Sequence, residues 1–329
     1  MFFTENFACR LNSFKSLSIK GNNKISKQEI KNLISEVFKI PGLTHVDLNY
    51  PDHFIDIQPR ELKSIISRKG LKLNGLAMRY YGNKSFERGA FFHPNLKIRN
   101  QAVELTLQAI DALNAMGGNL LTIWLGQDGY DYPFQIDYFE SYQILLKTFR
   151  RIASYNKKIR ISIEYKPFGP RSFGILPSMS STLLLIKDIA LPNVGATLDF
   201  CHSLLARENP ANAASQALKE HRLYGIHLND GFGKRDDGLS VGSVHLMQTV
   251  ELLYVLARCN YKGTIYFDTF PVGINPADEC RFNIHKVMTI NRLIKNINSS
   301  KLKNLLKTQD GIAANKLILE NLKLFSNKP

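Results

Sequence analysis

Four residues of the types that bind metal ions each stand at the end of a short apolar run. These are Glu164 after ISI, Asp199 after ATL, His227 after YGI and Asp268 after IYF. Three carboxylates that lie close together repel one another unless a proton or a cation intervenes. Three oxygen donors and one imidazole suit a divalent ion such as Mn²⁺, Co²⁺ or Mg²⁺ better than an ion that prefers thiolates. If the ends of these runs meet in the fold, we expect a divalent metal site, with Mn²⁺ as the first choice.

Two further polar residues follow the same runs. Lys166 is expected on the same strand face as Glu164, because alternate residues of a strand point the same way. His202 comes three residues after Asp199, so it is expected just past its strand, within reach of a second cation or of a substrate. The alternative is that each acid pairs with a basic neighbour such as Lys166 or Arg79 and that no metal binds.

The stretch HLNDGFGKRDDGLSVGS, residues 227–243, combines acids, an amide and glycines. Asn229 follows the apolar run, and the glycines then allow a sharp turn. Asp236 and Asp237 are expected to return carboxylates toward the same place. A phosphate-binding loop is less favoured, because GFGK lacks the spacing and the final Ser or Thr of a P-loop. The sequence therefore favours a metal-bearing loop.

A second stretch, WLGQDGYDYPFQ at residues 124–135, combines aromatic rings with amides and acids. Flat apolar rings suit the C–H faces of a polyhydroxylated ligand, and polar groups suit its hydroxyls. Core packing is the alternative role for Trp124. The candidate substrate-binding residues are Trp124, Gln127, Lys166, His202 and Asn229.

The elements that would position these residues alternate along the chain. Eight runs rich in Val, Ile, Leu, Phe and Tyr, at 7–14, 44–50, 71–80, 119–126, 159–167, 194–202, 223–230 and 263–271, are separated by helical periodicity, for example at 26–40, 95–117, 136–155, 179–190 and 245–260. Strand and helix alternating eight times predict an α/β fold, a single (β/α)₈ TIM barrel spanning 1–298. The apolar residues within 299–329 predict a helical extension. A doubly wound sheet is the alternative, which the lack of a GxGxxG turn disfavours.

Composition narrows the function classes. The chain has 329 residues, of which 44% are hydrophobic and 22% charged, as in a globular protein. No run approaches the 18 apolar residues of a membrane span, and no signal-peptide pattern is present, so we expect a cytoplasmic protein without a membrane partner. The net charge of +15 raises nucleic acid as a partner, but the lysines are spread along helical segments, which indicates a solvated surface. The four cysteines have no CxxC spacing, which argues against a zinc ribbon or a disulfide framework.

The motifs IEYKP, LDFCH, HLND with RDDGLSVGS, and FDTFP resemble the strand-end motifs of the xylose-isomerase-like TIM-barrel superfamily. Within it they look most like the bacterial L-rhamnose isomerases of broad sugar specificity. RLNSF near the start and WLGQDG also fit, so the resemblance spans about residues 7–290.

The resemblance implies a metal-dependent interconversion of an aldose and a ketose, in which a hydride moves between C1 and C2 of the open-chain sugar. It implies that Glu164, Asp199, His227 and Asp268 hold one divalent ion, and that His202 and Asp236 hold a second. Catalytic roles fall on Lys166, which polarises a sugar oxygen, and on Glu164 and Asp268. Relatives of this barrel commonly form homodimers or homotetramers.

Two departures from the isomerase pattern stand in the sequence. The usual Asp-x-Asp of the loop is replaced by RDDG, which places two acids side by side, so the second metal site is either altered or missing. The catalytic histidine that xylose isomerase carries on an early strand has no counterpart in LAMRYYGN, residues 76–83.

Three other functions remain open at this stage. A keto-sugar epimerase would use two carboxylates on opposite faces of the substrate. That chemistry is associated with Glu on both the fifth and eighth strands, whereas the eighth carries Asp268 here, and Lys166 also favours the isomerase. A sugar-binding barrel without catalysis is the second alternative. A DNA-repair endonuclease is the third, although its zinc cluster would need several more histidines.

Overall fold

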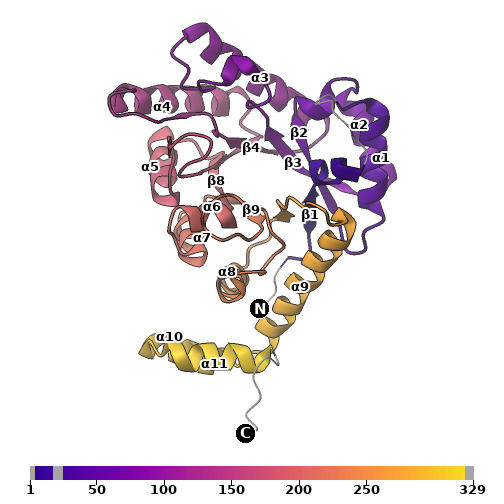
Figure 1. Ribbon diagram of the computed structural model, residues 1–329, viewed down its shortest axis with the longest axis vertical. Helices are drawn as coiled ribbons and strands as arrows, with labels where there is room; N and C mark the ends of the chain where they lie inside the picture. Colours follow the sequence, from indigo (N-terminus) through magenta and orange to yellow (C-terminus); the bar gives the residue numbers. More distant parts are fainter. Residues whose placement is uncertain (1–3, 18–24, 323–329) are drawn as a thin grey trace.

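Eight strands of the computed structural model, which describes residues 4–17 and 25–322, form one closed barrel (Figure 1). All eight barrel strands are parallel: β1 Phe7–Arg10, β2 His45–Tyr50, β3 Lys72–Met78, β4 Leu120–Trp124, β6 Arg160–Glu164, β8 Val194–Asp199, β9 Leu223–Leu228 and β10 Ile265–Phe267. Their order follows the chain, and β1 closes the ring by pairing with both β2 and β10. The predicted single TIM barrel is confirmed, and each of the eight predicted runs contains one strand.

The first predicted strand is too long. β1 ends at Arg10, and residues Leu11–Leu17 form a 3₁₀ helix. Leu11 and Phe14, three residues apart, are both buried. Because a 3₁₀ helix has three residues per turn, this spacing puts both side chains on its inner face. The apolar pattern therefore came from two different elements.

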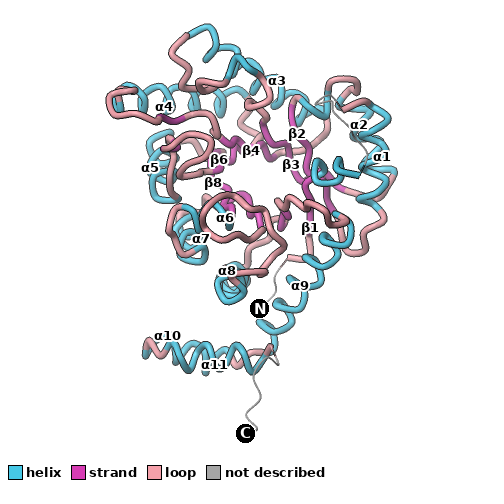
Figure 2. Tube along the Cα trace, in the orientation of Figure 1, coloured by secondary structure: helices cyan, strands magenta, loops and turns pink. Residues whose placement is uncertain are grey.

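Helices form an outer ring around the strands (Figure 2). The ring consists of α1 Lys27–Phe38, α2 Pro59–Arg68, α3 Leu96–Ala115, α4 Tyr138–Tyr155, α5 Met179–Ile189, α7 Pro210–Lys219, α8 Leu246–Arg258 and α9 Pro276–Asn296, while the short α6 Phe200–Leu205 directly follows β8. Each helix turns its apolar side to the sheet, as Ile30, Leu33, Ile34 and Val37 of α1 illustrate. Burial of both sheet faces explains why the strands read as apolar runs.

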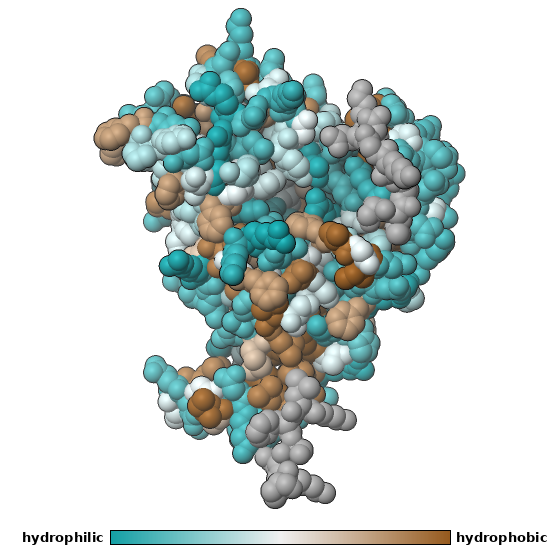
Figure 3. Space-filling model, viewed as in Figure 1, coloured by the Kyte–Doolittle hydropathy of each residue, from teal (hydrophilic) through white to brown (hydrophobic). Residues whose placement is uncertain are grey.

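Two helices lie beyond the ring, where the extension is predicted. α10 Ser299–Thr308 and α11 Gly311–Asn321 pack on each other and lie outside the ring, where they contact α8 and α9 (Figure 1). Leu302 and Leu317 are buried there, in a small cluster with Ile297. Figure 3 shows apolar side chains gathered on this part of the surface. Residues 323–329 of the predicted extension lie outside the described residues, and the division at residue 298 stays a prediction.

An antiparallel pair outside the barrel joins two loops at its mouth. β5 Gly129–Tyr130, after β4, pairs with β7 Phe173–Gly174, after β6. A Cβ on Gly129 would lie 2.1 Å from the Phe173 carbonyl oxygen, and one on Gly174 would lie 2.1 Å from the Lys166 oxygen. Glycine is therefore required for the two loops to approach so closely.

No helix in the described part of the chain combines the length and apolarity needed to cross a membrane. The cysteines form no disulfide, and Cys9, Cys201 and Cys280 are buried while Cys259 is exposed.

Candidate metal centre and active site

A cavity of about 410 Å³ opens at the carboxyl ends of the strands. In TIM barrels this end carries the active site. Its polar lining comes from residues on both sides of the ring: Arg10, Asn49, Arg79, Tyr81, Glu164, Lys166, His202, His227, Asp236, Tyr266 and Asp268. Trp124 and Phe270 add aromatic walls. The cavity is therefore large enough for a small polar ligand and rich in groups that ionise.

Four side chains from four successive strands meet beside this cavity, and all of them except the buried Asp199 line it. Glu164, Asp199, His227 and Asp268 each offer one ligand atom, and these atoms all lie within 4.8 Å of one another. His227 Nδ1 lies 3.3 Å from Glu164 Oε1. The four are the last residue of β6, the last of β8, one inside β9 and the one after β10. The closed barrel thus brings together the four residues that the sequence singled out.

A second group adjoins the first and shares one carboxylate with it. Asp199, His202 and Asp236 also place one ligand atom each within 4.8 Å of one another. His202 Nε2 lies 3.1 Å from Asp236 Oδ2. Asp199 is also the N-cap of α6, and its Oδ1 accepts a hydrogen bond from the His202 backbone N–H at 2.9 Å. This cap holds both side chains on one turn of the chain.

Lys166 is held at the edge of the second group. Its Nζ donates to Asp236 Oδ2 at 2.9 Å and lies 5.2 Å from the centre of the Trp124 ring. Trp124 in turn packs edge-on against Tyr81, with ring centres 5.2 Å apart. Trp124 therefore lies on the cavity wall, not inside the core, and it supports the ammonium group.

The electrostatics of the two groups favour a bound cation. Burial raises the pKa of Asp199 to about 7. Burial disfavours the charged forms of the histidines, but Asp199 and Asp236 outweigh it and raise the pKa of His202 to about 9. Glu164 has the same effect on His227, whose pKa rises to about 10. Protons thus accumulate where carboxylates crowd together, and a divalent cation would displace them.

Buried polar atoms without partners also fit a metal ion. His227 Nδ1 and Asp236 Oδ1 are both buried and make no hydrogen bond. A buried polar atom without a partner is costly unless another ligand satisfies it. One of these atoms belongs to each donor group, and each group combines carboxylate oxygens with an imidazole nitrogen. The residues present therefore fit two adjacent divalent ions that share Asp199.

Three predicted residues have other roles. Asp237 was expected at the cavity, and this is wrong: its carboxylate accepts from the Phe232 backbone N–H at 2.9 Å and from Arg235 Nε at 2.7 Å. Asn229 is fully buried, and its Nδ2 donates to Asp199 Oδ2 at 3.0 Å, which leaves it to orient that carboxylate. Gln127 is not among the residues that line the cavity, and its backbone carbonyl accepts from Arg171 Nε.

The cavity also contains groups that the sequence analysis did not assign as metal or substrate ligands, although it named Arg79 as a possible partner of the acids. Arg10 is the last residue of β1 and Arg79 follows β3, so both stand where strand ends meet. Residues at the ends of the strands surround the mouth of the barrel, so Arg10 would have been a candidate site residue if the first predicted strand had ended at Arg10. Tyr266 and Phe270 flank Asp268 and line the same cavity. The structure thus adds cationic and aromatic groups to the cavity wall beside the acids.

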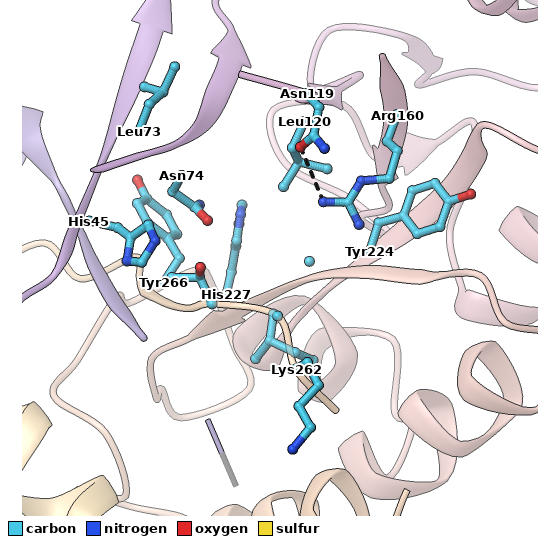
Figure 4. Close-up of a pocket in the computed structure, with 14 residues that line it drawn as sticks. His45, Leu73, Asn74, Asn119, Leu120, Arg160, Tyr224, His227, Lys262 and Tyr266 are labelled. Atoms are coloured by element: carbon cyan, nitrogen blue, oxygen red, sulfur yellow. Dashed lines mark hydrogen bonds between the residues drawn. The ribbon is translucent and has the colours of Figure 1, made fainter. Parts of the chain in front are cut away.

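A smaller cavity of about 220 Å³ lies at the other end of the barrel, at the amino ends of the strands (Figure 4). Among the described residues that line it, none is a carboxylate, and Arg160 donates to the Asn119 side chain at 3.4 Å. His227 and Tyr266 line both cavities. Because only one of the candidate ligands reaches this end, the mouth cavity is the candidate active site.

Known proteins share this fold and part of this sequence. A xylose isomerase of Thermus thermophilus is 26% identical over 215 residues, which are 64% of this chain and 56% of that enzyme. The chain therefore matches little more than half the length of this relative. Among solved structures, a D-tagatose 3-epimerase-like protein superimposes with a TM-score of 0.68 at 17% identity, covering 87% of this chain and 98% of that one. A D-allulose 3-epimerase from Methylomonas sp., solved with D-allulose, gives 0.66 at 17% identity and covers 87% and 97%. At these identities the structures establish the fold alone.

The family model for the xylose isomerase-like TIM barrel matches residues 40–285, which are three quarters of the chain. This stretch runs from just before β2 to within α9, so it contains every candidate ligand described above. The chain belongs to the xylose isomerase-like TIM barrel family.

Proposed function

We propose that this protein is a divalent-metal-dependent sugar isomerase that interconverts an aldose and a ketose. The observation that carries the proposal is the pair of adjoining donor groups that share Asp199, with Lys166 held at their edge in one cavity. Membership in the family supports sugar chemistry. The more specific likeness to L-rhamnose isomerases stays a prediction.

The proposed mechanism assigns the groups around the cavity as follows. Glu164, Asp199, His227 and Asp268 would hold one ion, and Asp199, His202 and Asp236 the other. A bound divalent ion polarises the carbonyl and hydroxyl oxygens of an open-chain sugar, which assists a hydride shift between its first two carbons.

The protein's own side chains would orient the sugar. Lys166 Nζ, fixed by Asp236, would donate a hydrogen bond to a sugar oxygen and stabilise negative charge as it develops there. Trp124 would cover the C–H face of the sugar and exclude water from it. Exclusion of water favours transfer of hydride over exchange of a proton with solvent.

A keto-sugar epimerase is the second candidate, and the placement of Glu164 and Asp268 favours it. Their carboxylates come from different strands, lie within 4.8 Å of each other and both reach the mouth cavity. Two such groups could act as base and acid on one carbon. The solved structures named above are called epimerases, but their identity of 17% carries no more than the fold.

The test begins with metal content after purification without a chelator. Aldoses and ketoses are then screened with and without Mn²⁺, and deuterium is followed from aldose labelled at C2 and from ketose labelled at C3. Transfer of the C2 label to C1 of the ketose product supports the isomerase. Loss of the C3 label to solvent supports the epimerase, and loss of the C2 label supports an isomerase that abstracts a proton. Bound metal with no turnover on any sugar would contradict both and favour a sugar-binding barrel.

Three finer statements belong to the same proposal. Mn²⁺ is the proposed ion because oxygen and imidazole donors suit it, with Co²⁺ and Mg²⁺ as competitors. A homodimer or homotetramer is the proposed assembly, which light scattering after size-exclusion chromatography would measure. The cytoplasm is the proposed location.

A further inference from the structure

Three cations gather on the side of the mouth formed by the first three strands. Arg10 and Arg79 line the cavity with side chains 23% and 17% exposed, respectively. Lys15, in the 3₁₀ helix after β1, is half-buried beside them. Burial lowers the pKa of Lys15, and repulsion by Arg79 and Arg10 lowers it further, which places all three charges within electrostatic range.

Both guanidinium groups lie over aromatic rings. The Arg79 guanidinium is 4.1 Å from the centre of the Tyr81 ring, and that of Arg10 is 4.4 Å from the centre of the Phe270 ring. Stacking leaves the N–H edges of a guanidinium free to bind an oxyanion. Arg79 Nε is buried and makes no hydrogen bond, although it lies within ion-pair distance of Asp52.

Among the described residues, acids balance the two guanidinium charges only in part. Arg79 Nε forms an ion pair with Asp52 Oδ2 at 3.5 Å, and Arg10 Nη1 forms one with Asp268 Oδ1 at 3.6 Å, both longer than a typical hydrogen bond. Asp268 also belongs to the first donor group, where a metal ion would take most of its charge. Clustered cations are costly in a partly buried cavity unless an anion joins them.

We infer that Arg10 and Arg79 bind an anionic substituent, a phosphate monoester or a carboxylate, on the sugar that occupies the metal centre. The inference rests on the proposed function and deepens it: the substrate is an anionic sugar. The carbonyl end of the sugar would face the donor groups, and its anionic end would face the cations of the first three strands.

The test is calorimetric titration of the Mn²⁺-loaded protein with three pairs of probes. The pairs are D-erythrulose, D-ribulose and D-fructose, each against its terminal phosphate. The matching uronates, which carry a carboxylate in place of the terminal CH2OH and keep the carbonyl, form a separate arm. Arg79 is changed because it contacts no candidate metal ligand. The matched control is Arg151→Met, since Arg151 pairs with Glu104 on the outer helices and is half-exposed.

We expect at least one anionic probe to bind more tightly than its neutral partner. Arg79→Met should lower the affinity for that probe by about tenfold to a hundredfold, as loss of a charged hydrogen bond does. The affinity for the neutral sugar should change by no more than about twofold. Arg79→Lys should retain part of the preference, and Arg151→Met all of it. The arm that responds, phosphate or uronate, identifies the anion.

Equal affinity for neutral and anionic probes, or an equal loss of both in Arg79→Met, would overturn the inference. Thermal unfolding of each variant verifies that it is folded. Binding is measured apart from turnover, so the two proposals can fail separately. Tight Arg79-dependent binding without isomerisation would refute the isomerase and retain the anion site, whereas turnover of neutral sugars alone would do the opposite.

Discussion

The two halves of the barrel mouth shift histidine pKa values in opposite directions. On the half built from β6, β8 and β9, carboxylates outweigh burial and raise the pKa of His202 to about 9 and of His227 to about 10. On the half built from β1, β2 and β3, burial lowers the pKa of His53 to about 3, and nearby cations lower it further. All three rings are almost completely buried.

Burial is common to the three histidines, so the neighbours decide the sign of the shift. One half of the mouth gathers acids that attract protons or a cation, and the other gathers cations that attract an anion. A ligand with a metal-binding end and an anionic end would satisfy both halves. Each of the following variants tests one side of this difference.

The largest effect is expected from Glu164→Gln. The change removes one negative charge from the first donor group, so metal content after dialysis should fall, and the turnover number should drop about a hundredfold to a thousandfold. Elemental analysis and the isomerase assay measure the two. Exposed Glu104→Gln is the control. Unchanged metal content in Glu164→Gln would contradict the assignment of this half.

Next comes the comparison of two adjacent acids. Asp236→Asn should lower the affinity for the second ion at least about tenfold, because Asp236 is the ligand that the loop after β9 supplies to the second group. Asp237→Asn should leave it unchanged, because that carboxylate binds Phe232 and Arg235. Titration of the apo protein with Mn²⁺ measures both. Equal losses would show that the loop does not discriminate between the two.

The cationic half is tested by pH. His53 Nδ1 accepts from the Asn49 N–H at 3.0 Å, so His53 must be neutral in the folded state. Because its folded pKa lies below the unfolded value, its contribution is complete above about pH 6.5 and is lost as pH falls toward 3. The free energy of unfolding should fall less steeply with acid in His53→Gln, by up to about 1.4 kcal/mol per pH unit. Urea titrations at several pH values measure the free energy of unfolding of the original protein and of His53→Gln. The same pH dependence in both would contradict the prediction.

The smallest effect is expected from Tyr81→Leu, which removes the ring beneath Arg79. Loss of a cation–π contact should lower the affinity for the anionic sugar about twofold to fivefold. Affinity for the neutral sugar provides the internal control. A loss as large as that in Arg79→Met would mean that Tyr81 binds the ligand directly.

The barrel and its acids could be predicted from sequence for a simple reason. Parallel strands buried on both faces appear as apolar runs, and their carboxyl ends converge at one mouth. An acid at the end of such a run is therefore a candidate site residue, as Glu164, Asp199 and Asp268 are. The rule failed for β1, where Leu11 and Phe14 of the 3₁₀ helix extended the apolar pattern beyond the strand.

The loops followed no such periodicity. Asp236 and Asp237 are adjacent and chemically identical, yet one faces the cavity and the other faces Arg235. The turn depends on Gly238, at φ +58°, where a Cβ would lie 2.3 Å from the Phe270 ring, a residue from another loop.

By itself, then, the sequence determined the closed barrel and the acids at its strand ends, because strand periodicity and strand polarity are local properties. Only the tertiary structure decided which acid of the loop points into the cavity. It also decided that Asn229 donates a hydrogen bond to Asp199, and that Arg10 and Arg79 line the same cavity. Those outcomes depend on backbone angles and on partners far away in the chain, and no local pattern records them.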